Sequence, residues 1–229
     1  TSGFNWIYNG CITDSVGFRD TSNPQGSSVY IWQWDFGDPA SGVNNTSNLR
    51  NPRHLFSTAG TYKVKLTVIT TAGCISLTDS AYVTITNVPA AIFSQSSPQC
   101  VGKNITFNDA STLVAPGSIT QWEWNFGDGS GAIINNSNAS VTHAYNAVGN
   151  YYATLQVKTN TGCTSKLDSL LVVVNPNPVA DFSLPNVCMP VGAAQFNDLS
   201  SISDNTQRPF TYSWNFGDPG SGAANTSTS

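Results

Sequence analysis

The sequence predicts an all-β protein built from tandem β-sandwiches, and three observations lead to this fold class. Small polar residues are abundant: Ser, Thr and Asn number 28, 24 and 24, whereas Glu and Met occur once each. Ser, Thr and Asn side chains compete for the backbone hydrogen bonds of a helix, while Glu and Met favour helices. The second observation is a set of short runs in which apolar and polar residues alternate, and the third is a motif repeated at a nearly constant interval.

The repeated motif is Trp-x-Phe-Gly-Asp, whose phenylalanine is residue 36, 126 and 216, a step of 90 residues each time. Two other sets of landmarks keep a step of 89 residues: Phe4, Phe93 and Phe182, and Phe18, Phe107 and Phe196. A period shared by unrelated positions indicates a tandem array. The predicted domains are residues 1–88, residues 89–176 and an incomplete third domain, residues 177–229. Proline-containing connections at residues 87–89 and 175–178 act as semi-rigid spacers, so we expect an elongated array.

Within each domain the strands follow from the alternation of side chains. Tyr30, Trp32, Trp34 and Phe36 fall on one face of an extended segment, because successive side chains of a strand point to opposite faces. Residues 62–68 alternate in the same way, and residues 82–85 form a last strand. Turn residues separate such runs about every 8 to 12 positions, which is typical of a sandwich. Each domain is predicted to contain about seven antiparallel strands in two sheets, the immunoglobulin-like plan.

Charge and hydropathy exclude several classes of partner. Nine basic residues stand against 13 acidic ones, and only 10% of the chain is charged. No basic face is large enough to follow a phosphate backbone, so a nucleic-acid partner is not expected. The longest aliphatic run, residues 170–174, is far shorter than the roughly 20 residues that span a bilayer, so no membrane span is expected.

The motifs resemble those of the PKD (polycystic kidney disease) domain. The first domain carries them at residues 34–38, 54–56 and 60–64, and the second at residues 124–129, 143–145 and 149–151. The Gly-Asp-Pro-Ala-Ser-Gly run at residues 37–42 and the Gly-Cys pairs look like the version found in large secreted surface proteins of Bacteroidota. The resemblance implies a β-sandwich that serves as a spacer, interaction or adhesion module, without catalytic residues and therefore not an enzyme.

The residues of the motif have physical roles that do not depend on the resemblance. Trp and Phe two positions apart on one face bury large apolar areas and anchor the two sheets. Gly allows a sharp turn, and the following Asp accepts backbone amides within it. The motif residues are Trp34, Phe36 and Asp38, then Trp124, Phe126 and Asp128, then Trp214, Phe216 and Asp218.

The five cysteines follow the repeat. They are Cys11, Cys74, Cys100, Cys163 and Cys188. Within the first two domains the two cysteines are 63 residues apart in each case (74 − 11 and 163 − 100). This spacing predicts one disulfide inside each complete domain and leaves Cys188 without its partner. The predicted disulfides indicate an oxidising compartment. Free or metal-binding thiols are the alternative, but the chain has no Cys-x-x-Cys spacing.

No catalytic group or cofactor is predicted. His54 and His143 occupy the same position in two repeats, and no nucleophile elbow or metal-binding His motif accompanies them, so a structural role is expected. Calcium near Asp35 and Asp38 is the open alternative, with Asp14 or Asp20 as further oxygen ligands. The first carboxylate of the motif is replaced by asparagine in the other two repeats, which weakens that alternative.

Two kinds of surface site stay open from the sequence. Ser15, Ser80 and Ser169 follow aspartate and precede an apolar residue, which looks like the acceptor pattern of O-glycosylation in Bacteroidota. Stacking of Trp32 and Trp122 on carbohydrate is an alternative to core packing, which we favour because both have core spacing. Trp6 aligns with no aromatic residue of the other repeats, so a surface role specific to the first repeat stays open.

The predicted function is a non-catalytic, extracellular repeat region that forms a rod-like spacer, an adhesion region or a filament segment. Its expected partners are other repeats of the same chain, like subunits, or cell-surface glycans and proteins. Two alternatives are an accessory region of a secreted hydrolase and a carbohydrate-binding module. Because the third domain lacks the strands equivalent to residues 141–175, we expect the natural chain to continue, with strand donation by a neighbouring molecule as the alternative.

Overall fold

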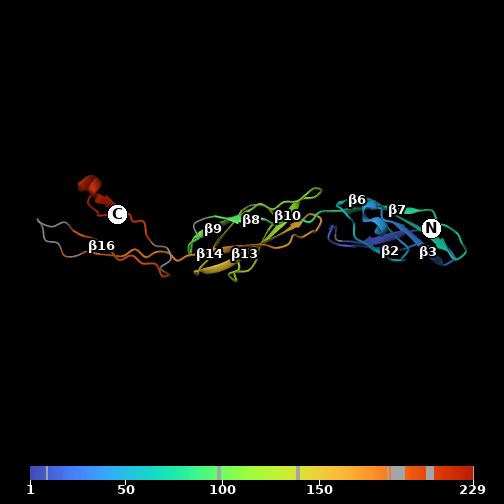
Figure 1. Ribbon diagram of the computed structural model, residues 1–229, viewed down its shortest axis with the longest axis horizontal. Helices are drawn as coiled ribbons and strands as arrows, with labels where there is room; N and C mark the ends of the chain where they lie inside the picture. The colour runs from blue at the N-terminus through green and yellow to red at the C-terminus, as the bar shows by residue number, and fades with distance from the viewer. Residues whose placement is uncertain are drawn as a thin grey trace. The chain divides into compact units, whose positions relative to one another are not determined.

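The structure is a computed structural model that describes residues 1–8, 10–96, 99–137, 140–184, 186, 194–204 and 209–228 (Figure 1). Its regular elements are β-strands in antiparallel sheets, joined by turns and two short 3₁₀ helices. The abundance of Ser, Thr and Asn has the predicted consequence, because these residues occupy strands and turns.

The first repeat contains seven strands in two sheets. One sheet has the order β1-β2-β5, with β1 at Phe4–Ile7, β2 at Val16–Asp20 and β5 at Arg53–His54. The other has the order β4-β3-β6-β7, with β4 at Thr46–Ser47, β3 at Val29–Asp35, β6 at Gly60–Thr70 and β7 at Asp79–Ile85. The 3₁₀ helix η1, Pro39–Asn45, connects β3 to β4.

The second repeat has the same plan. One sheet has the order β12-β9-β8, with β8 at Phe93–Gln95, β9 at Asn104–Asp109 and β12 at Val141–Ala144. The other has the order β11-β10-β13-β14, with β10 at Ile119–Asn125, β11 at Ile133–Asn135, β13 at Gly149–Thr159 and β14 at Asp168–Val174. The prediction of tandem immunoglobulin-like sandwiches is confirmed.

Aromatic rings fill the space between the two sheets of each of the first two repeats. Phe18, from one sheet, lies with its ring centroid 5.5 Å from that of Trp34, from the other sheet. The corresponding contact in the second repeat joins Phe107 and Trp124 at 6.2 Å. Trp34 also donates its indole N–H to the carbonyl oxygen of Leu49 at 2.9 Å. The paired aromatics therefore anchor the sheets as predicted.

The predicted alternation of the first Trp-bearing strand is wrong at one position. Trp34 and Phe36 are buried and Trp32 packs against the core, but the Tyr30 side chain is 67% exposed. Val29 pairs with Thr70 while Ile31 pairs with Ile69, so Tyr30 is an extra residue in the ladder. A β-bulge of this kind shifts the alternation by one residue, and Val29 replaces Tyr30 against the core.

The third repeat forms two small sheets among the described residues. β15, Phe182–Ser183, pairs with β16, Asn197–Asp198, and β17, Trp214–Asn215, pairs with β18, Thr226–Ser227, after the 3₁₀ helix η2, Pro219–Asn225. The Phe216 side chain is 37% exposed, whereas Phe36 and Phe126 are 1% and 0% exposed. Among the described residues, the aromatic face that is buried in the complete repeats is thus more exposed in this one.

The chain forms two compact units that do not coincide with the repeats. One comprises Thr1–Ser97, Asn104–His143 and Tyr151–Val172, and the other Pro98–Lys103, Ala144–Asn150 and Val173–Ser229. The first unit contains most of the strands of the two complete repeats, and the second contains the four strands β15 to β18. The domain boundaries at residues 88 and 176 stay a prediction.

The glycine of the motif lets the Trp-bearing strand approach its neighbour closely. Gly37 and Gly127 have φ angles of +69° and +75°, in the left-handed region. A Cβ atom added at Gly127 would lie 2.5 Å from the carbonyl oxygen of Tyr152 in β13, and one at Gly37 would lie 2.6 Å from that of Lys63 in β6. Glycine is required there both for the backbone angle and for the contact.

We expect Gly127→Ala to lower the free energy of unfolding by about 3 kcal/mol, from left-handed strain and a backbone clash. Gly129→Ala is the matched control, because Gly129 has a φ of +83° and no atom within 4 Å of an added Cβ. The control should cost only about 1 kcal/mol, the strain alone. Urea unfolding of both variants measures the difference, and equal losses would contradict the close approach.

Candidate functional site

A buried pair of Asp38 and His54 lies at the turn that follows the Trp-bearing strand of the first repeat. The two residues are 1% and 3% exposed, and His54 Nε2 lies 3.1 Å from Asp38 Oδ2. The Ser57 amide donates to Asp38 Oδ2 at 2.8 Å, and the Ser57 hydroxyl donates to Oδ1. The His54 ring stacks on Phe36 with centroids 4.3 Å apart. The pair thus ties the turn after β3 to the segment after β5.

The second repeat contains the same arrangement. His143 Nε2 lies 2.7 Å from Asp128 Oδ2, and its ring stacks on Phe126 at 4.0 Å. Here the amide and the hydroxyl of Ser130 donate to Asp128 Oδ1, within the turn itself. In the third repeat Asp218 accepts the Gly220 amide at 3.2 Å. The aspartate accepts an amide within the turn in these two repeats, but in the first repeat it accepts the amide of distant Ser57.

The order of contacts is not that of a hydrolytic triad. In a triad the imidazole lies between the nucleophile and the carboxylate and takes the proton of the nucleophile. In the first repeat the carboxylate of Asp38 lies between Ser57 and His54 instead. The Ser57 hydroxyl donates to a carboxylate and is not activated by the histidine, so these contacts serve the fold.

The electrostatics of the turn favour the charged carboxylate. Burial disfavours the ionised form of Asp128, but hydrogen bonds from Ser130 and His143 outweigh burial and lower the pKa of Asp128 to about 2. Burial also opposes ionisation of Asp38, and the bonds from Ser57 and His54 again lower its pKa. A charged aspartate is therefore part of the folded turn at neutral pH.

The first position of the motif binds a backbone amide whether it is charged or neutral. Asp35 accepts the Gly37 amide at 3.0 Å, and Asn125 and Asn215 accept the amides of Gly127 and Gly217 at 2.9 and 3.0 Å. Asp35 additionally bonds Lys65 Nζ at 3.0 Å. An acceptor is what the turn needs, which explains why aspartate and asparagine interchange at this position.

The carboxylates considered for calcium are engaged with protein donors. Asp38 faces His54, Asp35 faces Lys65, and Asp20 lies 3.4 Å from Arg50. Within the part of the chain that the structure describes, no three side chains of His, Cys, Asp or Glu gather in a way that would hold a metal ion.

The predicted pairing of the cysteines is wrong. Cys11 is bonded to Cys163, with Cα atoms 5.5 Å apart, while Cys74 and Cys100 are free, and Cys188 lies outside the described residues. Cys11 lies beside Thr86, next to the start of β6, whereas Cys74 follows the end of that strand. A strand of 11 residues separates the two ends by about 30 Å, but a disulfide requires Cα atoms within about 7 Å. A bond inside the first repeat is therefore excluded by the fold.

Spacing alone does not distinguish the two pairings. Because the repeat period is 89 residues, a cysteine 63 residues after Cys11 recurs 152 residues after it, at Cys163. The two bonding schemes use the same positions of the repeat. Only the strand that separates these positions within a repeat decides between them.

The candidate surface residues lie in different environments. Ser80 and Ser169 are exposed at equivalent positions of β7 and β14, whereas Ser15 is half-buried and its Oγ accepts a bond from Arg53. Trp122 is 6% exposed, in agreement with core packing, and Trp6 is 38% exposed. Modification of the serines stays a prediction.

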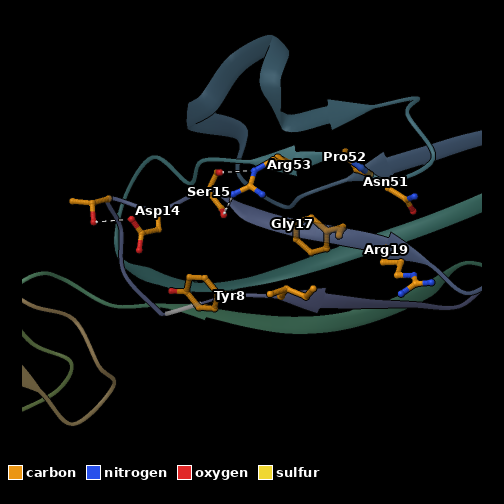
Figure 2. A pocket seen from close by; sticks show the side chains of 11 residues that line it. Tyr8, Asp14, Ser15, Gly17, Arg19, Asn51, Pro52 and Arg53 are labelled. Carbon is orange, nitrogen blue, oxygen red and sulfur yellow. Dashed lines mark hydrogen bonds between the residues drawn. The ribbon is translucent and has the colours of Figure 1, made fainter.

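A groove on the first repeat was not anticipated from the sequence. It has a volume of about 770 Å³ and lies over the sheet β1-β2-β5, and Ile7, Ser15, Gly17, Arg19 and Arg53 are among its lining residues. Figure 2 shows Arg53 and Ser15 joined by hydrogen bonds, with Asp14 and Arg19 toward opposite ends of the labelled residues. We name this feature the Arg19/Arg53 groove.

The repeated sandwich and its Trp-x-Phe-Gly-Asp turn are similar to those of a known family. The sequence model of a family described as PKD domain matches residues 9–85 and 86–174. The chain belongs to the PKD domain family. PKD domains are in general non-catalytic accessory domains and are typical of extracellular proteins, and the disulfide is consistent with such a location.

Parts of several known proteins are similar to parts of this chain. Collagenase ColA of Clostridium perfringens (strain 13 / Type A) is 32% identical over 91 residues, which is 40% of this chain and 8% of the collagenase. The PKD1 domain of the Vibrio cholerae metalloprotease PrtV is 26% identical, with a TM-score of 0.31, covering 37% of this chain and 93% of that domain. The PKD1 domain of Vibrio anguillarum Epp is 20% identical, with a TM-score of 0.32, covering 39% and 98%.

Within the described residues, no helix has both the length and the apolar character needed to cross a bilayer.

The lowered pKa of Asp128 predicts acid sensitivity of the second repeat. A carboxyl group with a depressed folded pKa contributes stability above its ordinary value of 3.8 and loses that contribution as the pH falls toward about 2. We expect Asp128→Asn to lower the free energy of unfolding at pH 7, and the difference from the parent chain to shrink between pH 4 and pH 2. Urea unfolding across this range measures it. A difference that is constant with pH would contradict a charged aspartate in the turn.

A second prediction concerns the pairing of cysteines in protein that is produced in an oxidising compartment. After alkylation without reduction and proteolysis, mass spectrometry should find the Cys11 peptide joined to the Cys163 peptide, with Cys74 and Cys100 alkylated. In the chain-entropy view, a closed loop of 152 residues stabilises the fold by up to about 5 kcal/mol. Cys11→Ser and Cys163→Ser should therefore lower the melting temperature equally. Recovery of peptides that join Cys11 to Cys74 would refute the pairing.

Proposed function

We propose that this chain is a non-catalytic, extracellular repeat region that serves as a spacer or adhesion region. The observation that carries the proposal is the bond between Cys11 and Cys163, which covalently joins the first repeat to the second. A cross-link of this kind has a mechanical consequence for a protein under tension. The partners that we expect for the repeat region are further repeats, like subunits, and glycans or proteins of a cell surface.

The mechanical consequence follows from connectivity alone. When a chain is pulled from its ends, residues between two bonded cysteines do not lengthen it, even after they unfold. Here the bond prevents the chain between Cys11 and Cys163, a separation of 152 residues, from adding to the extension. At about 3.3–3.6 Å per residue, roughly 500 Å of potential extension is withheld. A region that holds a binding domain at a constant distance from a surface benefits from this restriction.

The contacts of the repeated motif support the non-catalytic part of the proposal. Asp38 and His54, the residues with the most catalytic character, are buried in contacts with each other and with Ser57. Asp128 and His143 repeat the pair in the second repeat. Two copies of the same pair at the same turn are what a requirement of the fold produces.

An accessory region of a secreted hydrolase is the second candidate. It is favoured by the 32% identity over 91 residues to part of Collagenase ColA. In that case the repeats would hold a catalytic domain near its substrate. The sequence of the full-length gene product discriminates the two, because further repeats favour the spacer and a catalytic domain favours the accessory role.

Force spectroscopy tests the proposed mechanical role. Pulled from its two ends, the oxidised chain should lengthen by about 500 Å less than the reduced chain when the repeats unfold. Cys11→Ser should behave as the reduced chain, and Cys74→Ser, which removes a free thiol, should behave as the oxidised parent. Equal extension of the oxidised and reduced chains, or repeats that offer no resistance to force, would contradict the proposal.

A further inference from the structure

The Arg19/Arg53 groove is formed by the outer face of the sheet β1-β2-β5. Along β2, Val16, Phe18 and Asp20 are buried, so Gly17 and Arg19 point away from the core. Pairing places Ile7 of β1 opposite Gly17, and Gly17 opposite Arg53 of β5. Three neighbouring strands therefore present Ile7, Gly17 and Arg53 in one row.

Gly17 makes the floor of the groove. The residues on either side of it in the row are large, and the Ile7 side chain is 79% exposed. A Cβ atom added at Gly17 would lie 3.7 Å from Arg53 Nη1, an ordinary contact distance. The missing side chain thus leaves a depression beside a guanidinium group, and a larger residue would fill that depression without disturbing the backbone.

Arg53 is held in place before any ligand arrives. Its Nε donates to Ser15 Oγ at 2.9 Å, and its Nη2 donates to the Ser15 carbonyl oxygen at 3.1 Å. A guanidinium group has five N–H donors in a planar fork, so three remain for a ligand. An arginine fixed in this way loses less side-chain entropy when it binds a carboxylate. Figure 2 shows both bonds.

The charges around the groove are mixed. Arg19 and Arg53 are two of its lining residues and provide positive charge, while Asp14, at the other end of the lining from Arg19 in Figure 2, provides one carboxylate. Thr13 Oγ1 donates to Asp14 Oδ1 at 3.4 Å. Two cationic donors near one anionic acceptor suit a ligand that carries carboxylates together with hydroxyl donors.

The second repeat is a natural comparison, because it has the same sheet without the groove residues. At an offset of 89 residues, Ile7, Gly17, Arg19 and Arg53 are replaced by Ser96, Thr106, Asn108 and Thr142. The strand pairing is retained: Asn5 pairs with Arg19, and Ser94 pairs with Asn108. The fold does not require the two arginines or the glycine, so they are available for a role specific to the first repeat.

We propose that the Arg19/Arg53 groove binds an acidic polysaccharide through the carboxylates of its uronic-acid residues. Planar guanidinium groups bind carboxylates with two parallel hydrogen bonds, and Asp14 accepts sugar hydroxyls. The volume of about 770 Å³ falls in the range of ligand sites in proteins. A peptide that adds to a sheet uses unpaired backbone groups at an edge, whereas the floor of this groove is the central strand β2, which pairs with β1 on one side and with β5 on the other.

Calorimetric titration with hexagalacturonate at about 50 mM salt tests this inference on the full 229-residue chain. We expect a Kd of about 0.1 to 1 mM, as for a few charge-assisted contacts on an exposed face, and weaker binding at high salt. Arg53→Thr and Arg19→Asn, which copy the second repeat, should each weaken binding at least about fivefold. Gly17→Thr should do the same by filling the floor, without a change of charge.

Matched controls make the result specific. Lys166→Thr removes one positive charge from an exposed position of the second repeat and should leave the affinity unchanged. The same hexasaccharide with its carboxylates reduced to alcohols should not bind. NMR shifts on titration should be largest at the amides of Gly17 and Arg53, and each variant should keep the melting temperature of the parent chain.

Several outcomes would overturn the proposal. The first is absence of binding to hexagalacturonate, and the second is an equal loss in the Lys166→Thr control. A third is binding of the reduced hexasaccharide with the same affinity. If hexaglutamate binds as tightly with the same dependence on Arg53, the groove recognises acidic peptides and the assignment to a polysaccharide is wrong. None of these outcomes bears on the proposed mechanical role, which depends on the disulfide.

Discussion

The turn at the end of the Trp-bearing strand brings three requirements together in each complete repeat. In the first repeat, Phe36 must face the core, Gly37 must pass against the backbone of β6, and Asp38 must accept hydrogen bonds from groups on other segments. In the second repeat, Asp128 contacts His143 of another segment and accepts hydrogen bonds from Ser130 of the turn itself. Gly37 can lie against the backbone of β6 only if the strand before it and the turn after it keep their positions. Because Phe36, Gly37 and Asp38 are adjacent in the chain, we expect removal of one contact to disturb the aromatic core and the Asp–His pair together.

This dependence explains which features were predictable from the sequence. Trp34 and Phe36 recur with period two inside a longer period of about 90, and both periods are geometric consequences of strands and of repeats. The sandwich and the buried aromatic face follow from them. The roles of Asp35 and Asn125 were less apparent, since a charged and a neutral residue serve the same purpose as acceptors of a glycine amide.

Other features depend on distances that the sequence does not contain. Tyr30 faces away from the core, contrary to the prediction, because one extra residue in the ladder reverses the alternation of side chains. The sequence of this strand contains no pattern that indicates a bulge. The partner of Cys11 depends on which residues lie near the same end of a strand. Both possible partners occupy the same position of the repeat, so the repeat period does not distinguish them. The pair of Asp38 and His54 had a signal, since the same two residue types recur 16 and 15 residues apart, but only folding brings them together.

The two complete repeats agree in their interiors and differ on one outer face. Phe18 and Phe107 occupy equivalent core positions, whereas Gly17 and Arg53 are replaced by threonine in the second repeat. Such a division is expected where the core determines the fold and the surface carries a role specific to one repeat. With the proposed role of the Arg19/Arg53 groove, the array would combine a uniform scaffold with a binding surface on one repeat.

Native-state hydrogen exchange of the Ser57 amide is the most direct test of the dependence on this turn. That amide donates to the buried carboxylate of Asp38 at 2.8 Å, so its exchange reports opening of the turn. If the repeat depends on the turn, the amide should exchange only through global unfolding, with the free energy and the denaturant dependence of the buried strand β6. Exchange through a local opening of much lower free energy, while β6 stays protected, would contradict this account.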